Sequence, residues 1–239
     1  MPLPWIHQPM VGFDTETTGV SPTEDRLVTA SIIVVTGPEV TKHYWLANPG
    51  VAIPDRAAAV HGITTEIARR DGQPIRDVLD DVAQLLEVHC TQGHPIVAFN
   101  GSFDLTLLEC ELNRHDLPTL QERLGRSVGP LLDPLYLDKT YDKWRKGRRN
   151  LESVAQHYGV WRSDAFHNAE ADVLATLRVL AAIMRKFPEI TEEPLDVLEA
   201  KQRESYLDSA RYFARRAAER GQVTSEPMEW PVAGSIYGK

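Results

Sequence analysis

The stretch Val11-Gly12-Phe13-Asp14-Thr15-Glu16-Thr17-Thr18-Gly19 places two carboxylates inside what is otherwise an apolar strand pattern. Because side chains alternate along a strand, Asp14 and Glu16 point to one face, while Phe13 and Thr15 point to the other. Two neighbouring carboxylates repel each other and lose hydration when they are buried, so they need a compensating cation. The stretch therefore predicts a metal-binding strand end. An isolated acid pair that faces water is the alternative, and the rest of the chain must decide.

Composition limits the alternatives. The 239 residues are 42% hydrophobic and 25% charged, which suits one core with an appendage. Residues 1–5 lack the features of a signal peptide and no run reaches membrane-spanning length, so we expect a soluble, cytoplasmic protein that does not bind a membrane. Cys90 and Cys110 have no metal-like spacing and are expected to be buried thiols. The net charge of −8 argues against a protein that coats nucleic acid non-specifically, although a metal-filled acidic site can still accept a phosphodiester.

Further strands are predicted on both sides of the sequence centre. Residues 27–35 and 40–46 are rich in β-branched and aromatic residues, and together with the opening stretch they predict three antiparallel strands. Residues 95–99 form a short continuous apolar run, which is typical of a buried strand parallel to the first. Residues 131–136 predict an edge strand that is interrupted by a proline.

Helices are indicated by apolar residues at helical spacing and by flanking Gly and Pro residues. The expected helices cover residues 54–62, 75–88, 103–113, 151–158 and 195–220, with a short one leading toward Lys143. Another is opened by the block 167–172, with His167 in the loop just before it, and runs to about Phe187. Asp104 falls in the first turn of its helix, where the macrodipole alone favours an acid by about 0.3–1 kcal/mol. His61 falls at the end of its helix, where capping is the ordinary role. Neither residue is diagnostic by itself.

A basic loop stands out in this acidic chain. Residues 143–149 carry five positive charges, at Lys143, Arg145, Lys146, Arg148 and Arg149, with Trp144 among them. Such a loop is usually solvated. Beside an acidic metal site it could instead hold phosphates, while the indole packs on a base or sugar. The sequence supports the two interpretations about equally.

Three blocks in order then resemble a known family: Phe13-Asp14-Thr15-Glu16, Asn100-Gly101-Ser102-Phe103-Asp104 and His167-Asn168-Ala169-Glu170-Ala171-Asp172. They are similar to the three exonuclease motifs of the DEDDh (DnaQ-like) 3′–5′ exonucleases in the RNase H-like superfamily. His61-Gly62-Ile63-Thr64 is a fourth matching feature. The resemblance covers about residues 11–187, and the order of the blocks makes the set far more specific than any one of them.

The resemblance implies an α/β fold with a mixed five-stranded sheet, whose first three strands are antiparallel, flanked by helices. It implies an exonuclease domain over residues 1–188, followed by a C-terminal helix and tail over 189–239 that packs on the domain or on a partner. By motif position, two Mg²⁺ or Mn²⁺ ions would be held by Asp14, Glu16, Asp104 and Asp172, with His167 as general base. Contacts to the substrate are expected from Thr15, Thr17, Thr18, His61, Trp144 and Arg148.

The expected activity is removal of nucleoside 5′-monophosphates from the 3′ end of DNA, as in proofreading or repair. Single-stranded DNA is the leading substrate, and association with a polymerase or self-association through the C-terminal helix is open. Exoribonuclease activity, as in the oligoribonucleases and RNase T-like enzymes of the family, is the first alternative. A non-catalytic partner protein that keeps the fold is the second. The chain departs from the family at Asn168, where arginine is common, and at Val173, where alanine is common.

Overall fold

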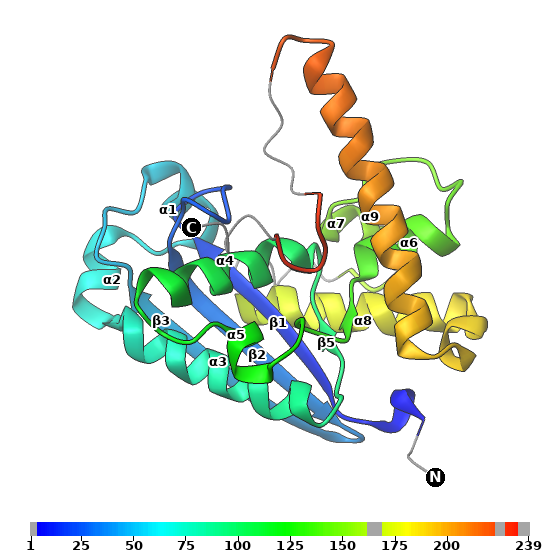
Figure 1. The fold of residues 1–239 in the computed structure, drawn as a ribbon, viewed down its shortest axis with the longest axis horizontal. Coiled ribbons are helices and arrows are strands. Elements are labelled where there is room, and N and C mark those ends of the chain that lie inside the picture. The colour runs from blue at the N-terminus through cyan, green and yellow to red at the C-terminus, as the bar shows by residue number, and fades with distance from the viewer. Residues whose placement is uncertain (1–3, 162–168, 223–227, 234–239) are drawn as a thin grey trace.

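The computed structural model describes residues 4–161, 169–222 and 228–233, and these form a mixed sheet flanked by helices (Figure 1). The strands are β1 (Met10–Thr17), β2 (Leu27–Thr36), β3 (Glu39–Asn48), β4 (Gln73–Pro74), β5 (Ile96–Val97) and β6 (Leu131–Leu132). Their order in the sheet is β4-β3-β2-β1-β5-β6. β1, β2 and β3 are antiparallel neighbours, whereas β5 is parallel to β1 and β6 is parallel to β5. The acid-bearing strand β1 therefore lies inside the sheet.

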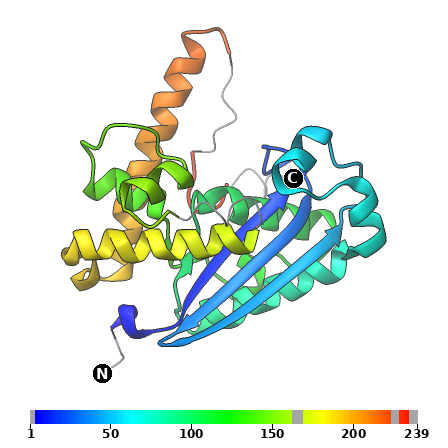
Figure 2. The same ribbon diagram turned by 180° about the vertical axis from the view of Figure 1, so that it is seen from behind.

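The longer helices are α3 (Ile75–Thr91), α4 (Gly101–Arg114), α8 (Ala169–Lys186) and α9 (Leu195–Ala218). The shorter ones are α1 (Asp55–His61), α2 (Thr65–Asp71), α5 (Leu120–Leu124), α6 (Pro134–Tyr141) and α7 (Leu151–His157), with 3₁₀ turns at Trp5–His7 and Pro188–Glu192. Helices α3 and α4 cover one face of the sheet and α8 crosses the other, as the two opposite views show (Figures 1 and 2). No helix of the described ranges is long and apolar enough to cross a membrane.

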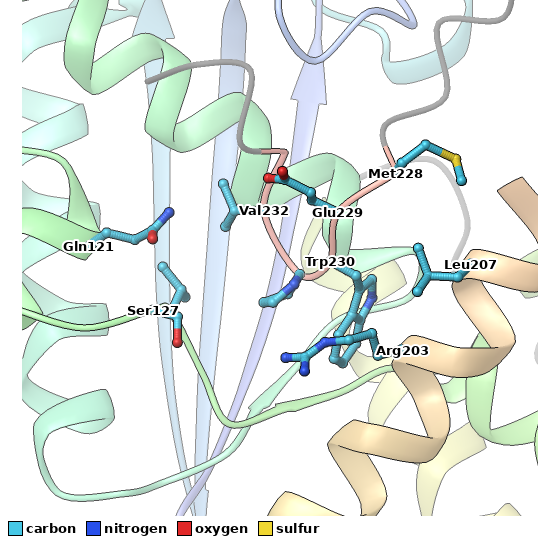
Figure 3. A pocket seen from close by; sticks show the side chains of 10 residues that line it. Gln121, Ser127, Arg203, Leu207, Met228, Glu229, Trp230 and Val232 are labelled. Atoms are coloured by element: carbon cyan, nitrogen blue, oxygen red, sulfur yellow. The ribbon is translucent and has the colours of Figure 1, made fainter. Parts of the chain in front are cut away.

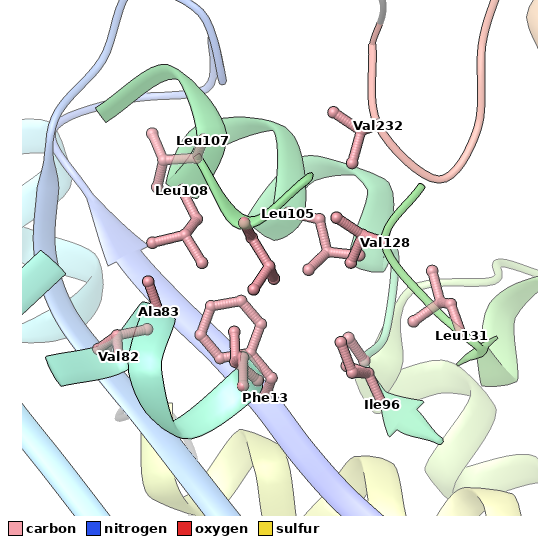
Figure 4. Close-up of a cluster of buried hydrophobic side chains, with 14 of the residues drawn as sticks. Phe13, Val82, Ala83, Ile96, Leu105, Leu107, Leu108, Val128, Leu131 and Val232 are labelled. Carbon is pink, nitrogen blue, oxygen red and sulfur yellow. The ribbon is translucent and has the colours of Figure 1, made fainter. Parts of the chain in front are cut away.

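The main core lies between the sheet and the pair α3 and α4. Phe13 is fully buried there, with Val82 and Ala83 of α3 and Leu105 of α4 around its ring (Figure 4). Burying a side chain of this size stabilises the fold by about 1.5–3 kcal/mol. Because residues alternate along β1, the burial of Phe13 on this face directs Asp14 and Glu16 toward α8.

Helix α8 packs closely on β1 because Gly12 has no side chain. A Cβ atom at Gly12 would lie 2.4 Å from Val173 Cγ1 and 3.0 Å from Leu177 Cδ1. The contact lies one residue from Asp172 in α8 and two residues from Asp14 in β1. This close approach brings the first turn of α8 to the acid-bearing end of β1.

The C-terminal extension packs against the rest of the protein. Helix α9 contributes Leu198 to the core on the α8 side and Tyr206 to the core on the α4 side. Beyond α9, the chain folds back and buries Trp230, which lines a cavity of about 320 Å³ beside Arg203 and Leu207 of α9 (Figure 3). The Ala233 N–H donates to Thr106 Oγ1 of α4 at 3.1 Å. The extension thus covers helix α4, which carries Asp104.

The expected architecture is confirmed, with local differences. The described sheet has six strands instead of five, because the two-residue β4, ending in a proline, pairs with β3 and is too short to give a sequence pattern. The expected strands at 95–99 and 131–136 are two residues each, since Asn100 turns the chain into α4 and Pro134 begins α6. Helices α2 and α5 were not expected. Both cysteines are buried, as predicted.

Candidate active site

Three of the predicted site residues come together at the end of β1. One carboxylate oxygen each of Asp14, Glu16 and Asp172 lies within 4.8 Å of the other two. Asp14 and Glu16 share a face of β1, and Asp172 reaches them from the first turn of α8. Oxygen ligands at this spacing are suited to hard divalent cations.

The electrostatics of this cluster favour bound cations. Burial, followed by the charges of Asp104, Asp172 and Glu16, raises the pKa of Asp14 well above its ordinary value. Burial and then the Asp172 charge raise the pKa of Glu16 to about 7. Within the described ranges, neither Asp14 nor Glu16 forms an ion pair with a lysine or arginine. A divalent cation would supply the positive charge that these carboxylates lack.

Asp104 approaches from the other side of β1. Its Oδ1 accepts hydrogen bonds from the Thr15 N–H at 3.0 Å and from Thr15 Oγ1 at 2.6 Å. The Thr15 N–H is free to make this bond because β5 pairs only with Val11 and Gly12, so the edge of β1 is open farther along. Burial raises the pKa of Asp104 to about 7, against the effect of the Thr15 hydrogen bonds. Asp104 is thereby fixed close enough to Asp14 to perturb its ionisation.

A chain of hydrogen bonds connects the start of α4, the helix that carries Asp104, to α9. The buried carboxylate of Asp133 accepts from the Asn100 N–H at 3.1 Å and from the Gly101 N–H at 2.9 Å, which fixes the start of α4. The backbone N–H of Asp133 in turn donates to Gln202 Oε1 of α9 at 2.6 Å. The Gln202 Nε2 donates to the Leu131 carbonyl at 3.1 Å, so α9 satisfies the outer edge of β6 with side chains.

The three threonines predicted to bind substrate all have partners within the protein. The Thr15 hydroxyl holds Asp104, the Thr17 hydroxyl donates to Gly19 O, and the Thr18 hydroxyl donates to Asp25 Oδ1. The Thr18 N–H and hydroxyl also bind the backbone of Arg26. The Thr17 and Thr18 hydroxyl groups shape the turn after β1. The contact of all three threonines with substrate remains a prediction.

His61 presents a buried donor. Its Nδ1 accepts from the Ile63 N–H at 3.2 Å, which places the proton of the neutral ring on Nε2. Burial lowers the pKa of His61, against an opposing interaction with the Thr17 backbone. Its Nε2 is buried without a hydrogen-bond partner in the described part of the chain. In the neutral ring this nitrogen carries the proton, and the ring lies beside the Thr17 backbone at the end of β1.

The basic loop divides into two groups. Arg145 and Arg149 both pair with the fully buried carboxylate of Asp138, so they are structural. Trp144 and Arg148 are exposed, the indole by 88%. They follow α6, whose first residue comes directly after Asp133, and they lie outside the carboxylate cluster. Their substrate role is untested.

His167 and Asn168 lie outside the described residues, so the predicted general base has no structural account. Sequence reasoning missed Asp133, although an aspartate before Pro134 is a typical helix N-cap signal. It also missed Tyr44 on β3. Tyr44 pairs with Ser31, which pairs with Asp14, so the three share a face, and burial and then the Glu16 charge raise the pKa of Tyr44.

The chain is similar to proteins that are named for DNA polymerase III. It is 32% identical to a DNA polymerase III subunit epsilon-like protein of Rhodobacter capsulatus, over 72% of this chain and 24% of the relative. It is 26% identical to a PolC-type DNA polymerase III of Lacticaseibacillus paracasei, over 74% of this chain and 11% of that protein. The chain thus spans a quarter or less of the length of these relatives.

The same fold occurs in solved structures of exonuclease I. The enzyme from Methylocaldum szegediense matches with a TM-score of 0.63 at 21% identity, over 77% of this chain and 42% of that one. Escherichia coli exonuclease I in complex with a dA16 oligonucleotide matches with a TM-score of 0.65 at 20% identity, over the same shares of the two chains. At these identities the likeness concerns the fold.

The family assignment rests on the sequence profile of the RNase_T exonuclease family, which matches residues 11–180. That range includes β1, α4 and the first turn of α8, the three elements that carry the four predicted metal-binding carboxylates. The chain belongs to this exonuclease family.

Proposed function

We propose that this protein is a divalent-metal-dependent 3′–5′ exonuclease that releases nucleoside 5′-monophosphates. The observation that carries the proposal is the cluster of Asp14, Glu16 and Asp172, whose carboxylate oxygens lie within 4.8 Å of one another. Two ions, Mg²⁺ or Mn²⁺, would neutralise these acids and Asp104, and would supply an activated water and stabilisation of the leaving oxygen.

Each predicted site residue near the carboxylate cluster has a defined role in this proposal. Asp14, central among the acids, would hold both ions, and Glu16 and Asp172 would complete their ligand sets with Asp104. Thr15 would orient Asp104 through its two hydrogen bonds to Oδ1. His167, which precedes α8 in the sequence, would accept a proton from water near neutral pH. His61 Nε2–H would donate to the terminal nucleotide, since it has no partner in the described part of the chain.

DNA is the preferred substrate in this proposal. The relatives are named for DNA polymerase III, and an exonuclease I neighbour was solved with a DNA oligonucleotide. The chain would then act on single-stranded DNA or DNA 3′ ends in the cytoplasm, in repair or proofreading, with residues 1–188 as the exonuclease domain and 189–239 as its extension. Association with a polymerase is part of the same proposal. Cleavage of RNA is the alternative, because a set of metal-binding carboxylates does not by itself distinguish DNA from RNA.

The test is product analysis of a 5′-labelled single-stranded DNA and of its RNA counterpart with Mg²⁺, with Mn²⁺ and with EDTA. We expect a metal-dependent ladder that shortens from the 3′ end, and the faster strand identifies the substrate class. Asp14→Asn and His167→Ala should each lower turnover at least about 100-fold, since losing even an outer-shell partner of a metal site costs 10–100-fold.

A matched control is Asp116→Asn, which changes an aspartate outside the carboxylate cluster in the same way. It should cleave like the wild type. Full activity of the Asp14→Asn variant would contradict the site assignment, and cleavage that persists in EDTA would contradict the role of metal.

A further inference from the structure

Positive charge is concentrated in two segments of this acidic protein. Residues 139–149 and 211–220 together hold ten lysines and arginines against the acids Asp142 and Glu219. They carry a net charge of +8 in a chain whose total is −8, so the remainder carries −16. The two segments lie on either side of one cavity of about 600 Å³ between α6 and α9, which is lined by Lys143 and Tyr212 among others.

The last third of α9 has little contact with the rest of the protein. The last buried residue of the helix is Ala210, and none of residues 211–218 is buried. This end of the helix projects from the molecule (Figures 1 and 2). Tyr212 and Phe213 are about half exposed, with their rings 5.4 Å apart. A charged helix with exposed aromatic rings beyond its packed part is suited to binding something else.

Exposed rings and cations also lie next to each other at two of the lining residues, Tyr212 and Lys143. Arg215 Cζ lies 5.8 Å from the centre of the Tyr212 ring, and Lys143 Nζ lies 5.6 Å from that of Trp144. Helical spacing places Arg215 and Arg216 three and four residues after Tyr212, on the same side of α9. The lining itself is closer to neutral, because Arg149 pairs with Asp138 and the acids Glu204 and Asp208 also line the cavity. Outside the lining, positive charge is carried by Arg215 and by Arg216, which forms an exposed ion pair with Glu219 at 3.3 Å that a phosphate would replace.

We propose that residues 211–220, which are the end of α9 and the two residues after it, form with the loop 142–150 a track for single-stranded nucleic acid, which holds the strand on the 5′ side of the end at the carboxylate cluster. Phosphates would contact Arg215 and Arg216, and bases would stack on the exposed rings, a mode that needs no particular sequence. Helix α6 begins after Asp133, which fixes the start of α4, and ends at the loop 142–150. Its eight residues span about 12 Å. A few nucleotides would therefore reach from the carboxylate cluster to the track.

This inference rests on the proposed function for the direction of the strand, but binding tests it separately. In EDTA no turnover occurs, and the acidic cluster repels the strand, so the remaining affinity reports the track. We would measure fluorescence anisotropy with a labelled oligothymidylate of about 20 nucleotides, longer than typical single-strand sites of about 4–16 nucleotides. The same measurement with oligouridylate should give similar results, because phosphates and stacking are common to both.

The variant is Arg215→Gln with Arg216→Gln, and the matched control is Arg69→Gln with Arg70→Gln, a second pair of adjacent exposed arginines on α2. The track variant should bind about tenfold more weakly, and the slope of log affinity against log salt should fall by about 1.4, or 0.7 for each lost phosphate contact. The control should bind like the wild type. Tyr212→Ala should also weaken binding without changing the salt slope.

Activity gives a second readout. With metal, the track variant should raise the KM for the long oligonucleotide about tenfold, leave kcat unchanged, and leave cleavage of a trinucleotide unchanged. Equal binding by wild type and track variant would overturn the inference, as would equal losses in the track and control variants. Track-dependent binding without any degradation would contradict the proposed function and leave the track supported. Polymerase capture by α9 would be the remaining use of this surface if the inference fails.

Discussion

At the scale of single residues, the carboxylate cluster links metal binding to stability. Burial raises the pKa of Glu16 from 4.5 to about 7, so the folded protein holds this proton more tightly than the unfolded chain does. The protonated acid is fully stabilising below pH 4.5, and that contribution is lost as the pH rises to about 7. Metal-free protein should therefore lose stability over this window because of Glu16.

The comparison that isolates this effect is wild type against Glu16→Gln in EDTA. As the pH rises from 4.5 to 7, the free energy of unfolding of the variant should increase relative to that of the wild type by on the order of 1–3 kcal/mol. Above pH 7 this difference should be constant. A divalent ion at a hundredfold excess over its Kd should stabilise the wild type by about 2.7 kcal/mol, which offsets or reverses the advantage of the variant, because the variant has lost a ligand. Urea unfolding at several pH values measures both. A difference that does not change with pH would refute the electrostatic account.

The contact between Gly12 and Val173 leads to a second prediction at the scale of single residues. An alanine Cβ at position 12 would lie 2.4 Å from Val173 Cγ1, and a valine on a helix has little rotamer freedom to retreat. Gly12→Ala should destabilise the protein by about 1–3 kcal/mol and raise the metal concentration needed for activity, because α8 must move with Asp172.

Adding Val173→Ala to that variant should restore much of both losses, since it removes the clashing methyl group. Denaturation and metal titration of the two single variants and the double variant form the cycle. Additive effects of the two substitutions would mean that the contact at Gly12 does not set the position of α8. If Val173→Ala does restore both losses, Gly12 provides the space for a valine at position 173, where the family commonly has alanine.

At the scale of elements, α9 works as a covering for the sheet edge. Gln202 is fully buried and binds the Asp133 N–H and the Leu131 carbonyl, so Gln202→Leu leaves two buried backbone groups without partners. Each such group costs about 1–3 kcal/mol. We expect a loss of about 2–5 kcal/mol in unfolding free energy, together with weaker metal activation, because Asp133 holds the start of α4.

Gln156→Leu on α7 is the control, since it makes the same change at an exposed position. It should be neutral for both measurements. If Gln202→Leu lowers stability but leaves the metal-activation midpoint unchanged, the connection from α9 to Asp104 has no functional effect.

The sequence was sufficient to predict most strands and helices but not the contacts between distant elements. The alternation of Phe13 against Asp14 and Glu16 was enough to predict the buried and acidic faces of β1, and helical periodicity was enough to place α3, α8 and α9. The sequence could not show that Arg145 and Arg149 form ion pairs while other charges of the loop are exposed. Their partner, Asp138, is brought to them only by tertiary packing. Gln202 was missed for the same reason, since its bonds join segments about 70 residues apart.

At the scale of the whole molecule, the extension and the exonuclease-family domain share their cores. Leu198, Tyr206 and Trp230 are buried among residues of the sheet and its helices. A chain that ends at residue 188 would expose these apolar surfaces and the unpaired edge of β6, which invites aggregation. We therefore expect residues 1–188 to be insoluble or partly unfolded, even though the family profile ends at residue 180.

A chain that ends at residue 222 gives the informative comparison. It keeps α9 and the cover of β6 but loses Trp230, whose removal from a core costs about 3–5 kcal/mol. It should fold, with a lower midpoint in urea than the full chain, and retain metal-dependent activity. Size-exclusion chromatography and urea unfolding of the three lengths test this order. A soluble, cooperatively folded and active 1–188 chain would show instead that the extension is a separate appendage, and that the edge of β6 is stable without α9.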